Sequence, residues 1–304
     1  MNVFLSTDHY EKPIVLALGF FDCVHLGHLA LINEAKKMAG KVGGETAIST
    51  FGNDPNSLLN KKAQVYSIEE RKIVFKNQGI DNVICEEFTK EFAEQTPIQY
   101  LDSLCARFNI VGVVAGRDYT FGKGAEGNVC LLKEYFAEKN VKVKIVPFEK
   151  ANTKKISTRY IKKFLEDGDI QVANSLLTQP YFIVGEVVHA RHRGTIIGYP
   201  TANIEEHSNT TMLATGIYIT KVYLDGKSYI GITNVGPKPT FGENNHTIET
   251  HILDFSKDIY GKTIQVEFHK KLREVTKFTS VPALCDQMKI DEKEAREFFN
   301  KSSI

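Results

Sequence analysis

The first part of the chain alternates short apolar runs with segments in which apolar residues recur every three or four positions. Short unbroken apolar runs are typical of strands buried on both faces, and the helical spacing between them is typical of crossover helices. The pattern predicts strands at Ile14–Phe20, Ala47–Phe51, Asn82–Cys85, Val111–Ala115 and Val141–Val146. It predicts helices near residues 27–39, 67–78, 97–108 and 128–139. This alternation favours an α/β domain of the Rossmann-like kind, a parallel sheet with helices on both faces.

Two further helices follow, and then the pattern changes. The helices are predicted at Ser157–Asp167, with Ser157 as N-cap, and at Ile170–Leu177, which Pro180 closes. The next segments are short, rich in Val, Ile, Tyr and Thr, and separated by Gly, Asp and Pro: Tyr181–His189, Gly216–Leu224, Lys227–Asn234, Thr247–Leu253 and Thr263–Lys270. They predict a small antiparallel β-barrel with a closing helix near residues 280–299. We therefore expect two domains, 1–180 and 181–304.

Composition narrows the class of protein without naming it. The 304 residues are 42% hydrophobic and 25% charged, which is ordinary for a globular protein of one or two domains. A net charge of +1 gives no field that would recruit nucleic acid, so no nucleic-acid partner is expected. Five cysteines without paired spacing indicate a reducing compartment, and no apolar run approaches membrane-spanning length. We expect a cytoplasmic protein without a membrane partner; its oligomeric state stays open.

The segment from Gly19 to His28 joins the first predicted strand to the first predicted helix. Residues three apart on a helix lie side by side, so His25 at the helix entry and His28 in the first turn can face one ligand. A helix N-terminus carries free N–H groups and a partial positive charge, which favour an anion. Gly27 weakens the helix and makes sense where a ligand approaches the backbone. We favour a phosphate site over the alternative, in which one histidine caps the helix and the other packs in the core.

A second candidate site is the loop Gly116–Gly122, at the edge of the sheet that also carries the histidines. Asp118, Tyr119 and Phe121 could hold a flat heterocycle by hydrogen bonding and stacking. The alternative is a glycine-rich turn. The overlapping run Gly122–Gly127 fits the pattern GxGxxG, but in a dinucleotide-binding fold the strand runs straight into the first glycine of the first unit. Here a polar loop intervenes and the strand is the fourth, so we disfavour an oxidoreductase; the absence of a GxxxxGK[ST] run excludes a P-loop kinase.

The barrel half carries its own candidates. Thr201 and Asn203 alternate like strand residues and offer two neutral oxygen ligands on one face, which suit Mg²⁺. Glu249 shares a face of its predicted strand with His251. A carboxylate pointing into a barrel needs a partner or a task. An ordinary turn and an exposed strand carboxylate are the respective alternatives.

Taken together, these segments resemble the bacterial bifunctional riboflavin kinase/FAD synthetase family over nearly the whole chain. The first half resembles the nucleotidyltransferase module in Gly19–His28, in Gly116–Gly122 and in Ile156-Ser157-Thr158 through Lys162. The second half resembles the riboflavin kinase module in Pro180-Tyr181, Gly198–Asn203, Gly231–Pro239, Glu249–Phe255, Leu272-Arg273-Glu274 and Lys277-Phe278. Several separate motifs occur in the same order, which makes the resemblance specific.

The resemblance implies two successive reactions. The second module would transfer the γ-phosphate of ATP to riboflavin, giving FMN, with Glu249 as general base and Mg²⁺ held by Thr201 and Asn203. The first module would transfer AMP from a second ATP to FMN, giving FAD and pyrophosphate, with His25 and His28 as catalytic residues. Nucleotide-binding roles are implied for Gly19, Phe20, Asp22, Gly27, Ser157, Thr158 and Lys162. Flavin-binding roles are implied for Asp118, Tyr119, Phe121 and Arg273. Asp22 either fixes its turn or contacts the nucleotide.

The sequence departs from the family pattern at several positions. Cys23 and Ala190 stand where the family usually has glycine, and Thr120 and Thr195 stand where it usually has arginine. Arg159 replaces a threonine and Lys162 an arginine, while Arg191 and Arg193 could supply charge near Thr195. Two alternatives therefore stay open: one activity only, most readily the adenylyl transfer, or a flavin- or nucleotide-sensing protein on the same scaffold. A tRNA-linked enzyme would need a basic surface and a KMSKS-like loop, and the sequence has neither.

Overall fold

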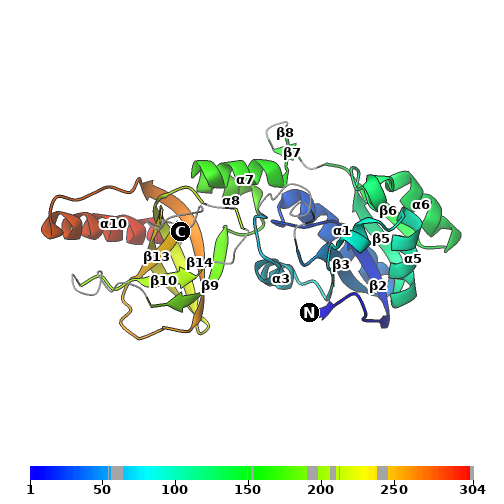
Figure 1. Ribbon diagram of the computed structural model, residues 1–304, viewed down its shortest axis with the longest axis horizontal. Helices are drawn as coiled ribbons and strands as arrows, with labels where there is room; N and C mark the ends of the chain where they lie inside the picture. The colour runs from blue at the N-terminus through cyan, green and yellow to red at the C-terminus, as the bar shows by residue number, and fades with distance from the viewer. Residues whose placement is uncertain are drawn as a thin grey trace. The chain divides into compact units, whose positions relative to one another are not determined.

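The structure is a computed structural model that describes residues 1–53, 55, 64–148, 150–151, 154–189, 198–205, 210–211, 213–237 and 246–301. Two compact units make up the chain, Met1–Thr158 and Arg159–Ile304 (Figure 1). The helices α7 (Thr158–Asp167) and α8 (Ile170–Leu176) thus group with the second unit, whereas the sequence places them before a boundary at residue 180. Asn174 of α8 explains the grouping, because its amide donates to the carbonyl of Phe268 in the barrel at 2.8 Å.

The first unit is built on a six-stranded parallel sheet, as predicted. Its strands are β1 (Asn2–Phe4), β2 (Tyr10–Leu18), β3 (Glu45–Phe51), β4 (Asn82–Glu86), β5 (Phe108–Gly116) and β6 (Lys142–Val146), in the spatial order β1-β4-β3-β2-β5-β6. Its helices are α1 (Leu26–Val42), α3 (Ile68–Asn77), α4 (Lys90–Ala93), α5 (Pro97–Arg107) and α6 (Val129–Glu138). The sequence pattern misses the edge strand β1 and the short antiparallel pair β7 (Lys150–Ala151) and β8 (Lys154–Lys155).

Alternation along β2 explains why helices cover both faces of this sheet. Ile14, Leu16 and Leu18 belong to one buried cluster with residues of α5 and α6. On the opposite face α1 packs directly on β5, because a Cβ added to Gly112 would lie 2.5 Å from Sδ of Met38. The predicted doubly covered sheet is therefore confirmed.

The strand order places a switch point beside β2. The next strands along the chain, β3 and β4, lie on one side of β2, whereas β5 and β6 lie on the other. Leu18 at the end of β2 pairs with Ala115 near the end of β5. Ligands in open α/β sheets bind at the carboxyl ends of strands where the order reverses. The loops that follow β2 and β5 begin side by side at that place.

The second unit contains a closed antiparallel barrel of six strands in the order β10-β13-β12-β11-β14-β9. The strands are β9 (Phe182–Val188), β10 (Ala202–Glu205), β11 (Gly216–Leu224), β12 (Lys227–Pro237), β13 (His246–Ile252) and β14 (Thr263–Arg273). Thr220, Thr233 and Thr250 are buried inside it and form a hydrogen-bonded chain of hydroxyls with 2.9 Å between neighbouring oxygens. The barrel prediction is confirmed, and β10 is the strand that the sequence pattern describes only as a strand-like turn.

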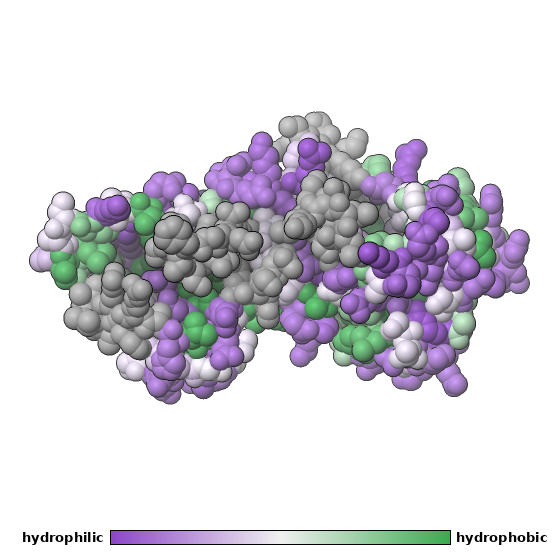
Figure 2. All heavy atoms as spheres, viewed as in Figure 1, coloured by the Kyte–Doolittle hydropathy of each residue, from purple (hydrophilic) through white to green (hydrophobic). Residues whose placement is uncertain are grey.

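Helices complete the second unit. The C-terminal helix α10 (Val281–Lys301) packs on the outer face of the barrel, where Ala295 joins a buried cluster with Ile219 and Ile232. In α7, Ile161 and Leu165 are the buried positions, and hydrophilic side chains dominate the face of this helix seen in Figure 2. Within the described residues, no helix is long and apolar enough to cross a membrane.

Candidate active sites

The two histidines of the first motif stack at the start of α1. His25 is the N-cap of this helix, and its Nδ1 accepts a hydrogen bond from the backbone N–H of His28 at 3.2 Å. The two imidazole rings are parallel within 8°, with centroids 3.8 Å apart. The capping role that the sequence leaves open is thus real for His25, and the same arrangement places both rings together at the helix N-terminus.

Burial keeps the His28 imidazole neutral, and the hydrogen bond of His25 indicates which of its ring nitrogens is an acceptor. Burial, and then the neighbouring His25, hold the pKa of His28 well below its usual range. Nδ1 of His28 is buried, and no hydrogen-bond partner reaches it from the described part of the chain. Because Nδ1 of His25 accepts a hydrogen bond, the proton of a neutral His25 sits on Nε2. The site can therefore offer an uncharged N–H donor beside the free N–H groups of the first helical turn.

The turn between β2 and α1 is held in an unusual backbone conformation. Phe21 and Val24 have φ of 52° and 43°, in the left-handed region that a β-branched residue such as Val24 rarely adopts. Between them, buried Asp22 accepts hydrogen bonds from the backbone N–H groups of Val65 at 2.7 Å and Tyr66 at 3.3 Å. These bonds support the turn-fixing role considered for Asp22, and its contact with a nucleotide stays a prediction.

Arg71 of α3 is a residue that sequence reasoning misses. Its guanidinium is fully buried and donates to the carbonyl oxygens of Phe20 at 3.2 Å and Phe51 at 2.7 Å, and to the Thr50 hydroxyl at 2.9 Å. The same group lies 4.9 Å from the ring centroid of Phe20. Arg71 thus ties together the ends of β2 and β3. Its place in an amphipathic helical pattern gives no signal of burial.

The remaining nucleotide-binding predictions lie on both sides of the unit boundary. Sγ of Cys23 lies 3.6 Å from the hydroxyl of Thr158, so the first and third motifs meet at this contact. Gly19 directly follows β2, Gly27 is the second residue of α1, and Ser157 directly precedes α7. Lys162 lies on α7 in the second unit. Nucleotide binding by these residues stays a prediction.

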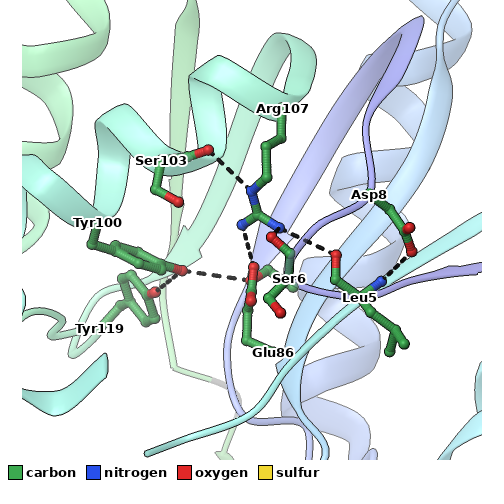
Figure 3. A network of polar contacts seen from close by, with 9 residues as sticks. Leu5, Ser6, Asp8, Glu86, Tyr100, Ser103, Arg107 and Tyr119 are labelled. Carbon is green, nitrogen blue, oxygen red and sulfur yellow. Dashed lines mark hydrogen bonds and ion pairs between the residues drawn. The ribbon is translucent and has the colours of Figure 1, made fainter. Parts of the chain in front are cut away.

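The loop after β5 exposes one predicted flavin ligand and packs two others. Asp118 is exposed. Tyr119 stacks on Phe121 with centroids 5.6 Å apart, and Phe121 is only 7% exposed within the core. Figure 3 shows the Tyr119 and Tyr100 hydroxyls, which lie 3.4 Å apart. Burial and the neighbouring Tyr100 raise the pKa of Tyr119 well above its usual range, so this phenol stays protonated.

The same close-up shows what holds the elements behind this loop. Arg107 at the end of α5 forms an ion pair with Glu86 at the end of β4, and both side chains are largely buried (Figure 3). Arg107 also donates to the backbone carbonyl of Ser6 at 3.0 Å. The pair therefore anchors α5, which carries Tyr100, to the carboxyl end of the sheet.

The GxGxxG run is explained by loop geometry. Phe121 and Gly127 exchange two backbone hydrogen bonds of 3.1 and 2.9 Å. Gly122 has φ of 74°, and an added Cβ would lie 2.6 Å from the backbone nitrogen of Pro97. The glycines close a compact loop, and α6 begins only afterwards with Asn128 as its N-cap. This arrangement differs from a dinucleotide fingerprint, in which the glycines lead directly from strand to helix.

In the second unit, strand pairing builds a row of polar side chains around Glu249. Glu249 of β13 lies opposite Asn203 of β10 on one side and opposite Asn234 of β12 on the other. The adjacent Thr250 faces the buried threonine chain, so the row occupies the outer face of the barrel. The expectation of a carboxylate pointing into the barrel is therefore wrong in direction, because strand alternation gives the interior to Thr250.

Glu249 and its neighbour Asn234 both present side-chain oxygens that lack partners among the described residues. Glu249 is partly buried and makes no hydrogen bond or ion pair with residues that the structure describes, and burial raises its pKa. Oδ1 of Asn234 is buried and also lacks a partner among the described residues. Asn234 belongs to the Gly231–Pro239 motif, but only the barrel pairing shows that it flanks Glu249. Thr201 directly precedes β10 and lies two residues before Asn203, so the two side chains are on the same side of the strand.

Two other predictions about this half have different outcomes. Arg273 of β14 is engaged with α10, because its guanidinium donates to Oδ2 of buried Asp291 at 2.7 Å. A flavin contact by Arg273 stays a prediction. Ala190 and Thr195, with Arg191 and Arg193, lie outside the described residues. In the described ranges, no three or more His, Cys, Asp or Glu side chains form a cluster that could hold a metal ion.

The first unit carries a histidine pair at a helix N-terminus, where a phosphate can bind, and the barrel carries a carboxylate without a partner among the described residues. Together they indicate a two-domain transferase that acts on phosphate-containing substrates. Comparison with known proteins gives the same division. A family model for FAD synthetase matches residues 7–160, and one for riboflavin kinase matches residues 177–299. The chain belongs to the family of bifunctional riboflavin kinase/FMN adenylyltransferases.

Individual relatives extend over both units. The bifunctional riboflavin kinase/FMN adenylyltransferase of Listeria monocytogenes is 36% identical over 303 residues, which is 98% of this chain and 96% of that protein. The protein of the same name from Escherichia coli K12 is 32% identical over 95% of this chain and 94% of its own length. A crystal structure described as a macrolide-efflux protein from Streptococcus pneumoniae is similar with a TM-score of 0.88 and 33% identity, covering 97% of this chain and 98% of that chain.

Proposed function

We propose that the second unit phosphorylates riboflavin with ATP to give FMN, and that the first unit transfers AMP from a second ATP to FMN to give FAD and pyrophosphate. The observation that carries this proposal is that each unit keeps its reactive groups together. His25 and His28 stack at the start of α1, and Glu249 lies between Asn203 and Asn234. A protein that only sensed flavins would have no need for an unengaged, partly buried carboxylate.

In the kinase reaction, a primary alcohol is a poor nucleophile and needs a base. Glu249 takes the proton of the 5′-hydroxyl of the ribityl chain while the hydroxyl oxygen attacks the γ-phosphorus of ATP. The bond from that phosphorus to the bridging oxygen breaks, and ADP leaves. The raised pKa makes Glu249 a stronger base than an ordinary glutamate, and no cation among the described residues pairs with its carboxylate.

The residues beside Glu249 fit a magnesium ion. Thr201 and Asn203 offer a hydroxyl and an amide oxygen on one side of the strand, and Oδ1 of Asn234 is a buried acceptor without a partner in the described ranges. Mg²⁺ takes oxygen ligands and keeps several of its waters, so few protein donors suffice. Bound by Thr201 and Asn203, Mg²⁺ would neutralise the phosphates of ATP.

In the adenylyl transfer, an oxygen of the FMN phosphate attacks the α-phosphorus of ATP while pyrophosphate departs. Charge builds up on the phosphate oxygens, so fixed donors contribute most of the catalysis. Nε2–H of His25 and the free N–H groups of the first turn of α1 are such donors. His28 completes the pair as a neutral imidazole stacked on His25.

Substrate contacts are proposed around these centres. Gly19, Phe20, Gly27, Ser157, Thr158 and Lys162 are proposed to bind the nucleotide, with Asp22 fixing their turn. Asp118, Tyr119 and Phe121 are proposed to contact the flavin of FMN, with Tyr119 presented on the packed ring of Phe121. Arg273 is proposed to act near riboflavin. The five cysteines are free thiols, which supports a reducing compartment such as the cytoplasm as the proposed location.

The direct test supplies the purified protein with riboflavin, ATP and Mg²⁺ and resolves the flavins by chromatography. FMN and then FAD are expected. If FMN accumulates and no FAD forms, the activity proposed for the first unit is wrong. If supplied FMN becomes FAD but riboflavin is not converted, the activity proposed for the second unit is wrong. No conversion of either flavin would favour a sensor.

Two substitutions assign the residues. His28→Ala should lower FAD formation by about 10²–10³ and spare FMN formation, since it removes one preorganised group from the first unit only. Glu249→Gln should do the reverse, because glutamine keeps the size and loses the base. Each variant is the control for the other. If either abolished both activities, the loss would reflect folding rather than catalysis.

A further inference from the structure

A histidine that the kinase chemistry does not use contacts the turn that leads into the proposed metal ligands. Nδ1 of His251 lies 2.8 Å from the carbonyl oxygen of Pro200. A carbonyl only accepts hydrogen bonds, so Nδ1 carries the proton and donates. The ring of Tyr199 meets the imidazole edge to face, with centroids 5.3 Å apart. His251 therefore touches the two residues that precede Thr201.

The other side of the same imidazole meets α10. Nε2 of His251 lies 3.7 Å from Oε1 of Glu292, and the two side chains are 12% and 27% exposed. The ring is thus placed between the C-terminal helix and the turn before β10. Because His251 and Glu249 alternate with Thr250, both side chains project on the outer face of β13.

Ion pairs fix the position of α10 on the barrel. Asp291, next to Glu292, is 3% exposed and receives both Nε and Nη2 of Arg273 from β14, at 3.1 and 2.7 Å. One turn further on, Arg296 forms a bidentate pair with Asp254 at 2.7 and 2.9 Å. The helix therefore gives His251 a rigid backing, because a buried bidentate pair resists displacement.

We propose that His251 is a positioning residue of the riboflavin kinase reaction. Braced on α10, it holds the carbonyl of Pro200 so that the oxygens of Thr201 and Asn203 stand beside Glu249. This inference rests on the proposed magnesium role of Thr201 and Asn203. Proline has no N–H with which to anchor itself, and pairing of β10 with β13 starts only at Ala202. The contact from His251 therefore fixes Pro200, which lies two residues before that pairing and directly precedes Thr201.

Two substitutions of His251 distinguish a positioning role from a merely structural one. In His251→Asn the amide nitrogen occupies the place of Nδ1 and keeps the donor to Pro200. In His251→Gln the amide reaches toward Glu292 instead and loses that donor. The matched control is His269→Gln, because His269 lies on β14 and its ring contacts the ring of Phe299 in α10 at 5.0 Å without contacting the turn.

The experiment measures FMN formation by the full-length protein against Mg²⁺ concentration, with Thr201→Ala as reference and FAD formation from supplied FMN as the check that the first unit is intact. We expect His251→Gln to raise the half-saturating Mg²⁺ concentration about 10–100-fold, as loss of a group behind a metal ligand does. His251→Asn and His269→Gln should stay near the unaltered protein. Equal behaviour of the Asn and Gln variants, or a shift in His269→Gln as large as in His251→Gln, would overturn the proposal.

The same series separates the two levels of inference. If Thr201→Ala leaves the Mg²⁺ dependence unchanged, the proposed metal site is wrong and the positioning role falls with it. If Thr201→Ala shifts the dependence and His251→Gln does not, the metal site stands and only the positioning role is wrong.

Discussion

Asn234 and Glu249 face each other across the antiparallel pair β12–β13, and in the described part of the chain neither Oδ1 of Asn234 nor the Glu249 carboxylate has a hydrogen-bond partner. An amide that lies beside the proposed catalytic carboxylate can orient that carboxylate or a phosphate bound next to it. Its buried Oδ1 without a partner is costly unless a ligand satisfies it.

We therefore expect Asn234→Ala to lower the turnover of riboflavin to FMN by about 10–100-fold. Adenylylation of supplied FMN by the same preparation should be unchanged. Tyr229→Phe, a substitution near the start of β12, is the control. A variant with normal FMN formation would show that Asn234 only fills space on the barrel surface.

The lowered pKa of His28 predicts a specific dependence of stability on pH. As pH falls through about 6.5, an unfolded chain protonates this histidine while the folded chain does not. The folded state therefore loses stability on acidification, whereas His28→Gln lacks this loss. The difference in melting temperature between the unaltered protein and His28→Gln should become less favourable to the unaltered protein from about pH 7.5 to 5.5.

Thermal melts at several pH values measure this effect, with His9→Gln as a control at an exposed histidine of the same unit. A difference that is constant with pH, or that grows in favour of the unaltered protein at low pH, would show that His28 is not held neutral.

Arg71→Lys should destabilise the first unit. Lysine cannot reach the carbonyl oxygens of Phe20 and Phe51 together, so at least one hydrogen bond to a charged donor is lost, at about 1.5–3 kcal/mol. Chemical denaturation monitored within that unit measures the change. Thr50→Val removes the hydroxyl that Arg71 also contacts, and should have a smaller effect. Equal stability of the lysine variant would mean that the fork geometry is unimportant.

Cys23→Gly would restore the residue that the family usually has, and we expect it to lower stability rather than raise it. The backbone at Cys23 is not in the left-handed region, so glycine relieves no strain there. The change would free the unfolded chain and remove a buried side chain, at about 1–2 kcal/mol.

Turnover of FMN to FAD by Cys23→Gly at a temperature where the variant is folded should remain close to normal, since the Thr158 hydroxyl stays in place. Cys23→Ala, with an intermediate loss of stability, is the control. An increase in turnover with glycine would mean that the thiol obstructs the site.

Local sequence patterns predict much of this fold, because the spacing of apolar residues indicates burial and Gly, Pro and Asp residues mark the turns. Gly216–Leu224 has the predicted bounds, and α5 starts at Pro97 as expected. The start of β2 is predicted too late, because Glu11 and Lys12 interrupt the apolar run on which the prediction depends. The edge strand β1 has only three residues, too few to show a period.

The candidate sites divide in the same way. The histidine pair is a local spacing and can be found by reading along the chain. Asn234 and Arg71 cannot be found in this way. Only strand pairing places Asn234 beside Glu249, and Arg71 is buried although arginine usually faces water. The engagement of Arg273 by Asp291 likewise depends on where α10 packs.

The turn with Phe21 and Val24 in left-handed conformations has a consequence for the energetics of binding. Asp22 and Arg71 hold this turn in shape through contacts made within the protein, before any substrate arrives. The conformational entropy of this turn is lost when the chain folds, so binding of the proposed nucleotide would cost little further entropy here. Substitutions that loosen this turn should therefore weaken binding of the proposed nucleotide mainly by making the entropy of binding less favourable.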